Sequence, residues 1–336
     1  MNLKRKIIIL SAIFLFLSCI GAYWLLKAPK VSIVMPVYNG AQYLEQTIGF
    51  LLQSKYKDFE FVIIDDGSTD DSWEKLQKIA KQDSRIKLYK NEKNMGIVKT
   101  RNRGFELARG EYIAPMDQDD WSLPDRLKLE VEYLDKHPDV AIVDVGTILL
   151  ADYYQGIKDE RMGAISWLME TGENEKKHYS LDERDENIKL SLFFSCAVPT
   201  QSAAMMRRSW FDKHQVRYTE GVRYADDYYL YADMIKKGAR FHHIEDIAHI
   251  YNDVREHSVS FVQKQIDEVN AVKRELYQWA GIDFDNYLNM NVEEFVCAVL
   301  RDMLDGDEAK LRFSKELLEK NQRLLCLDKP TQKNGA

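Results

Sequence analysis

The apolar positions of the chain form three successive patterns. Residues 7–26 make one apolar run without a charge. From residue 31, short runs rich in Val and Ile alternate with amphipathic stretches, which is typical of repeated β-α-β units around a parallel sheet. Beyond residue 260 the apolar residues recur at helical spacing. The pattern predicts an N-terminal apolar segment, an α/β domain over residues 29–260 and a helical C-terminal extension over residues 261–336.

The α/β part predicts elements in a regular order. The first run, Val31 to Val37, is almost continuously apolar, which suits a strand covered on both faces of a sheet. The predicted strands cover residues 31–37, 59–64, 86–89, 111–116 and 140–150, and the predicted helices residues 41–52, 97–108 and 263–280. Residues 152–187 are polar and charged, and we expect loops and short helices there, over the site.

The N-terminal apolar run has about the length that crosses a bilayer. We therefore predict that residues 1–28 are a single-pass membrane anchor with a short basic N-terminus. A cleaved signal peptide is the alternative, although the run is long for one. Lys4, Arg5 and Lys6 precede the run and Lys27 and Lys30 follow it, a small bias that favours a cytoplasmic N-terminus.

Composition narrows the function classes. With 336 residues, of which 45% are hydrophobic and 30% charged, the chain is predicted to be globular. The net charge is -7 and the basic residues are dispersed, so nucleic acid is not an expected partner. The four cysteines stand far apart, which predicts reduced thiols and no zinc site: Cys19, Cys196, Cys297 and Cys326.

Acidic residues follow two of the predicted strands directly. Asp65 and Asp66 come after the strand over 59–64, and Asp117 and Asp119 come after the strand over 111–116. Ligands of open parallel sheets bind at the carboxyl ends of the strands, so the two clusters should share one crevice. Carboxylates are suitable ligands for Mg²⁺ or Mn²⁺, and such an ion would neutralise the diphosphate of a departing nucleotide.

Five segments together resemble the successive motifs of the family 2 glycosyltransferases. They are VSIVMPVYNG, FVIIDDGSTDDS, NMGIVKTRNRG, GEYIAPMDQDDW and YADDYYLYADMIKKGA, and they span roughly residues 31–260. The resemblance implies the GT-A fold, a mostly parallel sheet flanked by helices. It also implies a nucleotide-diphosphate sugar donor, Mn²⁺ or Mg²⁺, and inverting transfer to an acceptor hydroxyl in polysaccharide, lipopolysaccharide or glycolipid synthesis.

The resemblance assigns roles residue by residue. Asp117 and Asp119 match the metal-binding Asp-x-Asp motif, with Asp119 favoured for direct metal contact, while Gln118 replaces the small residue usual between them. That departure leaves the contacts with the donor sugar in doubt. The residues that match the family's donor-binding positions are Pro36, Tyr38, Asp66, Asn94, Gly96, Arg101, Asn102 and Asp117.

The catalytic base is predicted from the last motif. An acceptor hydroxyl attacks poorly unless a positioned group takes its proton, and Asp227 matches the family's base. The family usually has Glu-Asp here, whereas this chain has Asp226-Asp227. A purely structural N-terminal cap is the alternative for such a pair. His257, in an Arg-x-His segment with Arg255, is a candidate for the diphosphate or the metal, or a histidine with a structural role.

Two other classes of function compete with a transferase. A catalytically silent membrane-anchored binding or scaffolding protein would keep the fold, although here every expected carboxylate is present. A dinucleotide-dependent enzyme is set aside, because no glycine-rich turn follows the first strand. The donor sugar, a glycan or lipid-linked acceptor, the side of the membrane and self-association through the C-terminal helices stay open.

Overall fold

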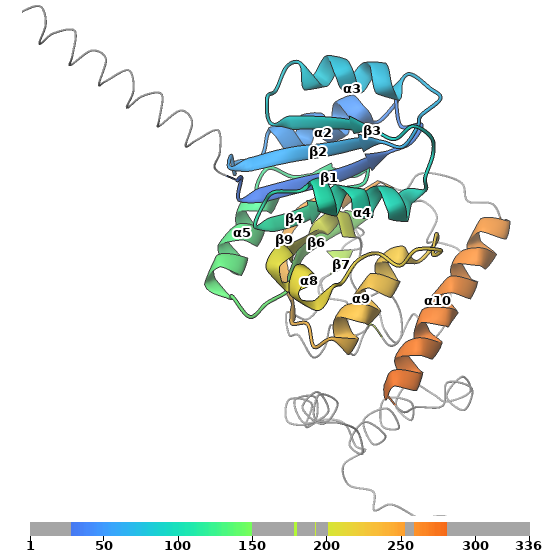
Figure 1. The fold of residues 1–336 in the computed structure, drawn as a ribbon. Coiled ribbons are helices and arrows are strands. Elements are labelled where there is room, and N and C mark those ends of the chain that lie inside the picture. Colours follow the sequence, from blue (N-terminus) through green and yellow to red (C-terminus); the bar gives the residue numbers. More distant parts are fainter. Residues whose placement is uncertain (1–27, 150–177, 180–191, 193–200, 253–258, 281–336) are drawn as a thin grey trace, which may run out of the picture.

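The computed structural model describes residues 28–149, 178–179, 192, 201–252 and 259–280 (Figure 1). The predicted anchor, apart from residue 28, lies outside the described residues, as do the four cysteines, His257 and the C-terminal extension beyond residue 280. Among the described helices, none is both long enough and apolar enough to span a bilayer. The membrane anchor therefore stays a prediction.

One mixed sheet organises the described part of the chain (Figure 1). Its strands lie in the order β3-β2-β1-β4-β8-β6-β9-β5, and β7 pairs with β6. Their bounds are β1 Val31–Val37, β2 Phe59–Asp65, β3 Ile86–Lys90, β4 Tyr112–Pro115, β5 Trp121–Ser122, β6 Ile142–Leu149, β7 His178–Tyr179, β8 Ala204–Arg207 and β9 Phe241–Tyr251.

Helices connect these strands and cover the sheet. Their bounds are α2 Leu44–Leu52, α3 Ser72–Ala80, α4 Ile97–Leu107, α5 Arg126–Lys136, α8 Arg208–His214, α9 Asp226–Lys236 and α10 Val259–Ala280, with a 3-10 turn, η2, at Gln201–Ala203. The predicted strands and helices of the first half are confirmed to within a few residues, including the strand over 111–116, which is shorter as β4.

The expectation of a mostly parallel sheet holds for only one half. Strands β3, β2, β1 and β4 are parallel neighbours. Beyond β4 the pairings of β8 with β4 and β6, of β7 with β6 and of β5 with β9 are antiparallel, and only β6 and β9 run parallel. Regular helical crossovers, whose pattern is visible in a sequence, are needed only between parallel strands. The antiparallel pairings of the second half carry no such pattern, so the prediction of a mostly parallel sheet was wrong there, although the strand predicted over 140–150 is confirmed as β6.

The inner strands are buried on both faces, as the apolar run of the first strand predicts. In β1, Val34 belongs to one core cluster, while Ile33 and Met35 belong to another. The same alternation in β2 places Ile64 in the first cluster and Ile63 in the second. Successive side chains of a strand point to opposite faces, so each strand contributes to two cores.

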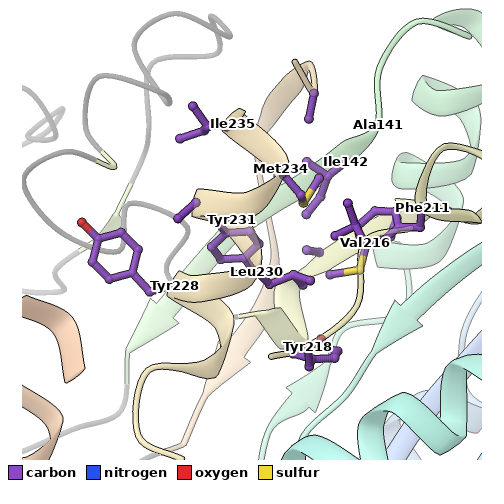
Figure 2. Packing of buried hydrophobic residues seen from close by; sticks show 14 of the residues in the cluster. Ala141, Ile142, Phe211, Val216, Tyr218, Tyr228, Leu230, Tyr231, Met234 and Ile235 are labelled. Carbon is purple, nitrogen blue, oxygen red and sulfur yellow. The ribbon is translucent and has the colours of Figure 1, made fainter. Parts of the chain in front are cut away.

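Helix α9 lies at the centre of the first core cluster. Figure 2 shows Tyr231 and Met234 of this helix pointing toward Ile142 of β6 and Phe211 of α8. Tyr228, Leu230 and Tyr231 are all fully buried. Helix α10 packs against α9 and adds three buried side chains to the same cluster: Val272, Leu276 and Tyr277. The first part of the C-terminal extension thus shares its core with α9 and with strands β6 and β8.

The two halves of the sheet meet at a short seam. Strands β4 and β8 pair at only two positions, Tyr112 with Arg207 and Ile113 with Met206. Arg207 donates hydrogen bonds to the backbone carbonyls of Val140, Leu134 and His137. Arg126, fully buried on α5, donates to the carbonyls of Pro115 and Ala204, one on each side of the seam. Arg126 therefore joins the two sides of the junction, and Arg207 fixes β8 against the end of α5.

Candidate active site

A cavity of about 780 Å³ opens at the carboxyl ends of the parallel strands. The residues that immediately follow β1, β2 and β4 line it, among them Tyr38, Asp66 and Asp117. Parallel strands bring their carboxyl ends to one edge of a sheet, and this edge holds both acidic clusters, as the sequence predicts. The far wall comes from the turn before α9, from the first turn of α9 and from Gln265 of α10.

Asp66 organises the turn that leads into α4. Its Oδ1 accepts hydrogen bonds from Asn91 Nδ2 at 2.7 Å and from the Met95 backbone N–H at 2.9 Å. Its Oδ2 accepts from the Gly96 N–H at 2.9 Å, and Asn94 Oδ1 accepts from the same N–H. Gly96 has a φ of 89°, which glycine adopts without strain. A carboxylate has about four acceptor positions, so Asp66 retains capacity toward a ligand in the cavity.

Gln118, the middle residue of the Asp-x-Asp motif, holds the turn after β1. Gln118 Oε1 accepts a hydrogen bond from the Tyr38 backbone N–H at 3.0 Å, and Gln118 Nε2 donates to the Tyr38 carbonyl at 3.3 Å. The Tyr38 side chain is 43% exposed and lines the cavity, which leaves its ring accessible for stacking. Gln118, the departure from the family pattern, thus joins the two loops.

Asp117 and Asp119 both line the cavity. The Asp117 N–H donates to Ser202 Oγ at 2.9 Å. Asn252 donates from Nδ2 to the Asp119 carbonyl at 3.2 Å, while its backbone N–H donates to Asp120 Oδ1 at 3.1 Å. These contacts fix the motif between η2 and the residue that follows β9.

These two carboxylates fit a divalent ion that is shared with a substrate. Within the described ranges, no three His, Cys, Asp or Glu side chains gather closely enough to hold an ion by themselves. Mg²⁺ is commonly bound by one or two carboxylates together with substrate phosphates, and Mn²⁺ also suits hard oxygen ligands. Asp119 is only 6% exposed and lines the cavity, so a ligand bound there would meet a largely desolvated carboxylate.

Arg101 joins the metal motif to the helix that carries the predicted base. Its guanidinium is buried and donates from Nη2 to Asp117 Oδ1 at 2.6 Å and from Nη1 to Asp226 Oδ2. The Tyr218 ring centroid lies 5.5 Å from the Arg101 Cζ. A planar guanidinium can hold two carboxylates in a fixed geometry. Asp226, the first residue of the Asp-Asp pair, thus binds Arg101.

Asp227 is in the first turn of α9 and lines the cavity. The N-cap residue of this helix, Ala225, makes no capping hydrogen bond with its side chain. Burial, and next the neighbouring charge of Asp226, raise the pKa of Asp227 to about 6. A carboxylate with such a pKa is ionised at neutral pH and holds a proton more strongly than an ordinary aspartate. The geometry and the protonation equilibrium both suit a general base.

Most of the residues predicted from the sequence meet at this cavity. Pro36, Tyr38, Asp66, Asn94, Gly96, Arg101, Asp117, Asp119 and Asp227 line it. Asn102 is not among the lining residues. Its side chain instead forms two hydrogen bonds with the backbone of Tyr218, donating at 2.9 Å and accepting at 3.0 Å. His257 lies outside the described residues, so its role stays a prediction.

Several contributors were not predicted from the sequence. Asn91 and Ser202 position Asp66 and Asp117 through single hydrogen bonds. Gln265 of α10 lines the cavity although it comes after the last recognised motif. The helical pattern of residues 263–280 predicts the helix, but periodicity says nothing about which distant residue its polar face will meet. The contribution of α10 could be found only in three dimensions.

Two of the solved structures with the same fold hold a nucleotide sugar. One is S. aureus TarS 1-349 in complex with UDP-GlcNAc, with a TM-score of 0.54, 17% identity and coverage of 88% of this chain and 91% of that one. The other is the mannosyltransferase PcManGT from Pyrobaculum calidifontis in complex with GDP-Man and Mn²⁺. Its TM-score is 0.52 at 15% identity, covering 89% of this chain and 83% of that one. At these identities the likeness shows the GT-A fold.

Curated relatives are also glycosyltransferases. An uncharacterized glycosyltransferase of Haemophilus influenzae is 27% identical over 250 residues, 74% of this chain and 73% of that protein. The putative glycosyltransferase EpsE of Bacillus subtilis is 35% identical over 40% of this chain, and the putative teichuronic acid biosynthesis glycosyltransferase TuaG of the same organism is 37% identical over 32%. These two alignments span 49% and 42% of the relatives. The model of the family described as Glycosyl transferase family 2 matches residues 32–215, more than half of the chain, and the chain therefore belongs to glycosyltransferase family 2.

Proposed function

We propose that the protein is a metal-dependent, inverting glycosyltransferase that moves a sugar from a nucleotide-diphosphate donor to an acceptor hydroxyl. Family membership makes the chain a transferase. One observation carries the finer assignment: the metal motif and the predicted base face a single cavity, and Arg101 links them through Asp117 and Asp226. A donor bound at one wall would meet an acceptor activated at the other.

The donor side is supported by the turn geometry and by the structural neighbours. Tyr38 offers an accessible ring and Asp66 offers an acceptor beside the Asn94–Gly96 turn, which suits a nucleoside. Neighbours of the same fold were solved with UDP-GlcNAc and with GDP-Man and Mn²⁺. A nucleoside diphosphate sugar is therefore the proposed donor. The relative named for teichuronic acid biosynthesis supports a role in polysaccharide synthesis.

Asp119 and Asp117 are the residues that would hold Mn²⁺ or Mg²⁺, because both are carboxylate side chains that line the cavity. When bound, the ion supplies positive charge that stabilises the diphosphate leaving group. Other residues of the chain hold the Asp-x-Asp motif in position. Arg101 keeps Asp117 in place, and Ser202 and Asn252 hold the backbone of the motif.

The proposed chemistry is a single displacement. Asp227 takes the proton of the acceptor hydroxyl as its oxygen attacks the anomeric carbon, and the bond between that carbon and the diphosphate oxygen breaks. The nucleoside diphosphate leaves with the electron pair, and the anomeric configuration inverts. The raised pKa of Asp227 supports this role, because it brings the proton affinity of the base closer to the working pH.

Membrane attachment is proposed from the N-terminal apolar run of the sequence. An anchor over residues 1–28 would hold the domain beside a lipid-linked or glycan acceptor. The charge bias favours a domain outside the cytoplasm, whereas bacterial donors of this kind are cytosolic, so the side of the membrane is left open. Self-association remains an alternative role for the C-terminal helices.

The test uses the full chain purified in detergent and a panel of nucleotide sugars that includes UDP-GlcNAc and GDP-mannose. Release of nucleoside diphosphate is measured with Mn²⁺, with Mg²⁺ and with excess EDTA. We expect release with one nucleotide class that depends on the ion and is lost in Asp227→Asn, since an amide cannot take the proton. Nucleotide-dependent thermal stabilisation without release from any donor would favour the silent binding protein.

A further inference from the structure

Helix α10 contributes a carboxylate to the turn that precedes the base. Glu268 Oε2 accepts hydrogen bonds from the backbone N–H of Tyr224 at 2.6 Å and of Ala225 at 2.9 Å. The Arg223 N–H donates to both Glu268 oxygens at 3.2 Å. Three successive backbone donors thus converge on one side chain that lies more than forty residues further along the chain.

These donors belong to the start of α9. Ala225 is the N-cap residue, and Asp226 and Asp227 are the first helical residues. The backbone N–H groups at the start of a helix have no intrahelical acceptor, and a negative charge placed there is favourable. Glu268 therefore places a negative charge just before the first turn of α9, on the N–H groups of the N-cap residue and of the two residues that precede it.

The same face of α10 continues along the cavity. Gln265, three residues before Glu268, lines the cavity, and Phe261 contacts the Tyr224 ring edge-on with centroids 5.1 Å apart. Residues at spacings of three and four lie on one side of a helix. Gln265, Phe261 and Glu268 therefore form a single stripe that faces the 221–224 turn and the first turn of α9.

The core fixes the position of this stripe. Val272 and Leu276 of α10 are fully buried in the cluster that contains α9. Lys236 near the end of α9 pairs with Glu275 at 3.2 Å. The two helices thus pack together along their length (Figure 1), so the carboxylate of Glu268 is held at a defined place relative to Asp227.

We infer that Glu268 is a positioning residue for the catalytic base, and that α10 is thereby a working part of the active site. The inference rests on the proposed function, in which Asp227 is the base. Glu268 orders the 223–225 turn, and this turn fixes the direction in which α9 presents Asp227 to the cavity. Loss of the carboxylate would leave three backbone donors without their acceptor and would loosen the first turn of α9.

The expected signature is a fall in kcat with little change in the donor KM. The donor wall is formed by the ends of β1 and β2 and by the turn before α4, whereas Glu268 holds the turn before α9. A misplaced base weakens an interaction that exists only in the transition state, so kcat falls while the affinity for the donor is unchanged. A merely structural role would instead lower the amount of folded protein and leave kcat per folded molecule unchanged.

The experiment compares Glu268→Gln, Glu268→Asp and a matched control, Glu275→Gln, in the full chain. Glu275 lies on the same helix, half exposed, in the ion pair with Lys236. Release of nucleoside diphosphate from UDP-GlcNAc or GDP-mannose, whichever the wild type turns over, gives kcat and KM with water as acceptor, and thermal unfolding reports the folded state.

We expect Glu268→Gln to lower kcat about tenfold, the effect of one lost charge-assisted hydrogen bond, with the donor KM within about twofold. Glu268→Asp retains the charge and should recover part of the rate, and Glu275→Gln should behave as the wild type. Wild-type kcat in folded Glu268→Gln would overturn the inference. Wild-type kcat in Asp227→Asn would instead overturn the proposed function, so the two failures are distinguishable.

Discussion

Gly40 and Gln118 form a pair whose energetic coupling can be measured. A Cβ built on Gly40 would lie 2.3 Å from Gln118 Oε1 and 2.6 Å from Gln118 Cδ, far inside van der Waals contact. The Gln118 side chain would have to swing away and would lose both of its hydrogen bonds with the Tyr38 backbone. Gly40→Ala therefore acts through Gln118.

The magnitudes follow from the contacts. Each partly exposed hydrogen bond contributes about 0.5–1 kcal/mol, so Gly40→Ala loses about 1–2 kcal/mol through Gln118. Gly40 is not among the glycines with a positive φ, so alanine fits its backbone and restricts the unfolded chain, a gain of about 0.4–1 kcal/mol. With Gln118 already replaced by alanine, the loss disappears and only the gain remains. The same substitution should destabilise the wild type and stabilise Gln118→Ala.

The assay is urea unfolding of the four proteins of this double-mutant cycle at constant pH. Gly49→Ala is the matched control, because its added Cβ meets no atom within 4 Å and α2 should gain up to about 1 kcal/mol in either background. Equal changes for Gly40→Ala in both backgrounds would refute the reasoning. The thermal shift with the preferred nucleoside diphosphate should fall in Gly40→Ala, because the Tyr38 turn loses its support.

Two further predictions concern the catalytic centre. The transfer rate should fall as the pH drops through about 6, because protonation removes the base form of Asp227. The effect on stability has the opposite sign: between the pKa of an unfolded aspartate and about 6, the contribution of Asp227 to the free energy of unfolding should decrease as the pH rises. A rate that is constant from pH 5 to 7 would contradict the assignment. Arg101→Met should lower the free energy of unfolding by about 3–5 kcal/mol, because the buried carboxylate of Asp226 and the partly buried carboxylate of Asp117 lose their cation. In Arg85→Met the partly exposed pair with Asp83 should cost below about 1 kcal/mol, and equal losses in the two variants would be against this account.

The donor half of the site could be predicted because local rules determine it. Asp66 and Asp117 follow parallel strands, and parallel strands end at one edge of the sheet. The spacing of the apolar residues predicted these strands, and the strand directions then predicted that the two carboxylates lie close together. Asn102 departs from its expected role because its neighbour in space is the backbone of Tyr218, more than a hundred residues away.

The acceptor half was less predictable because it depends on long-range contacts. Strand β8 pairs antiparallel with both of its neighbours, without the helical crossovers that make a parallel strand recognisable in sequence, and β9 pairs parallel with β6 but antiparallel with β5. Glu268 likewise has the appearance of an ordinary polar position on an amphipathic helix. Only the arrangement of α9 and α10 assigns it three backbone donors.

The seam between β4 and β8 has a consequence for how this chain can change during evolution. Arg126 joins its two sides through the carbonyl oxygens of Pro115 and Ala204, and Arg207 holds β8 to carbonyl oxygens at the end of α5 and before β6; every amino acid possesses such an oxygen. Neighbouring side chains can then be exchanged without removing an acceptor, provided that the two arginines and the local backbone are kept. The half of the sheet on the proposed acceptor side can then diversify in sequence while the half on the proposed donor side stays attached in the same orientation.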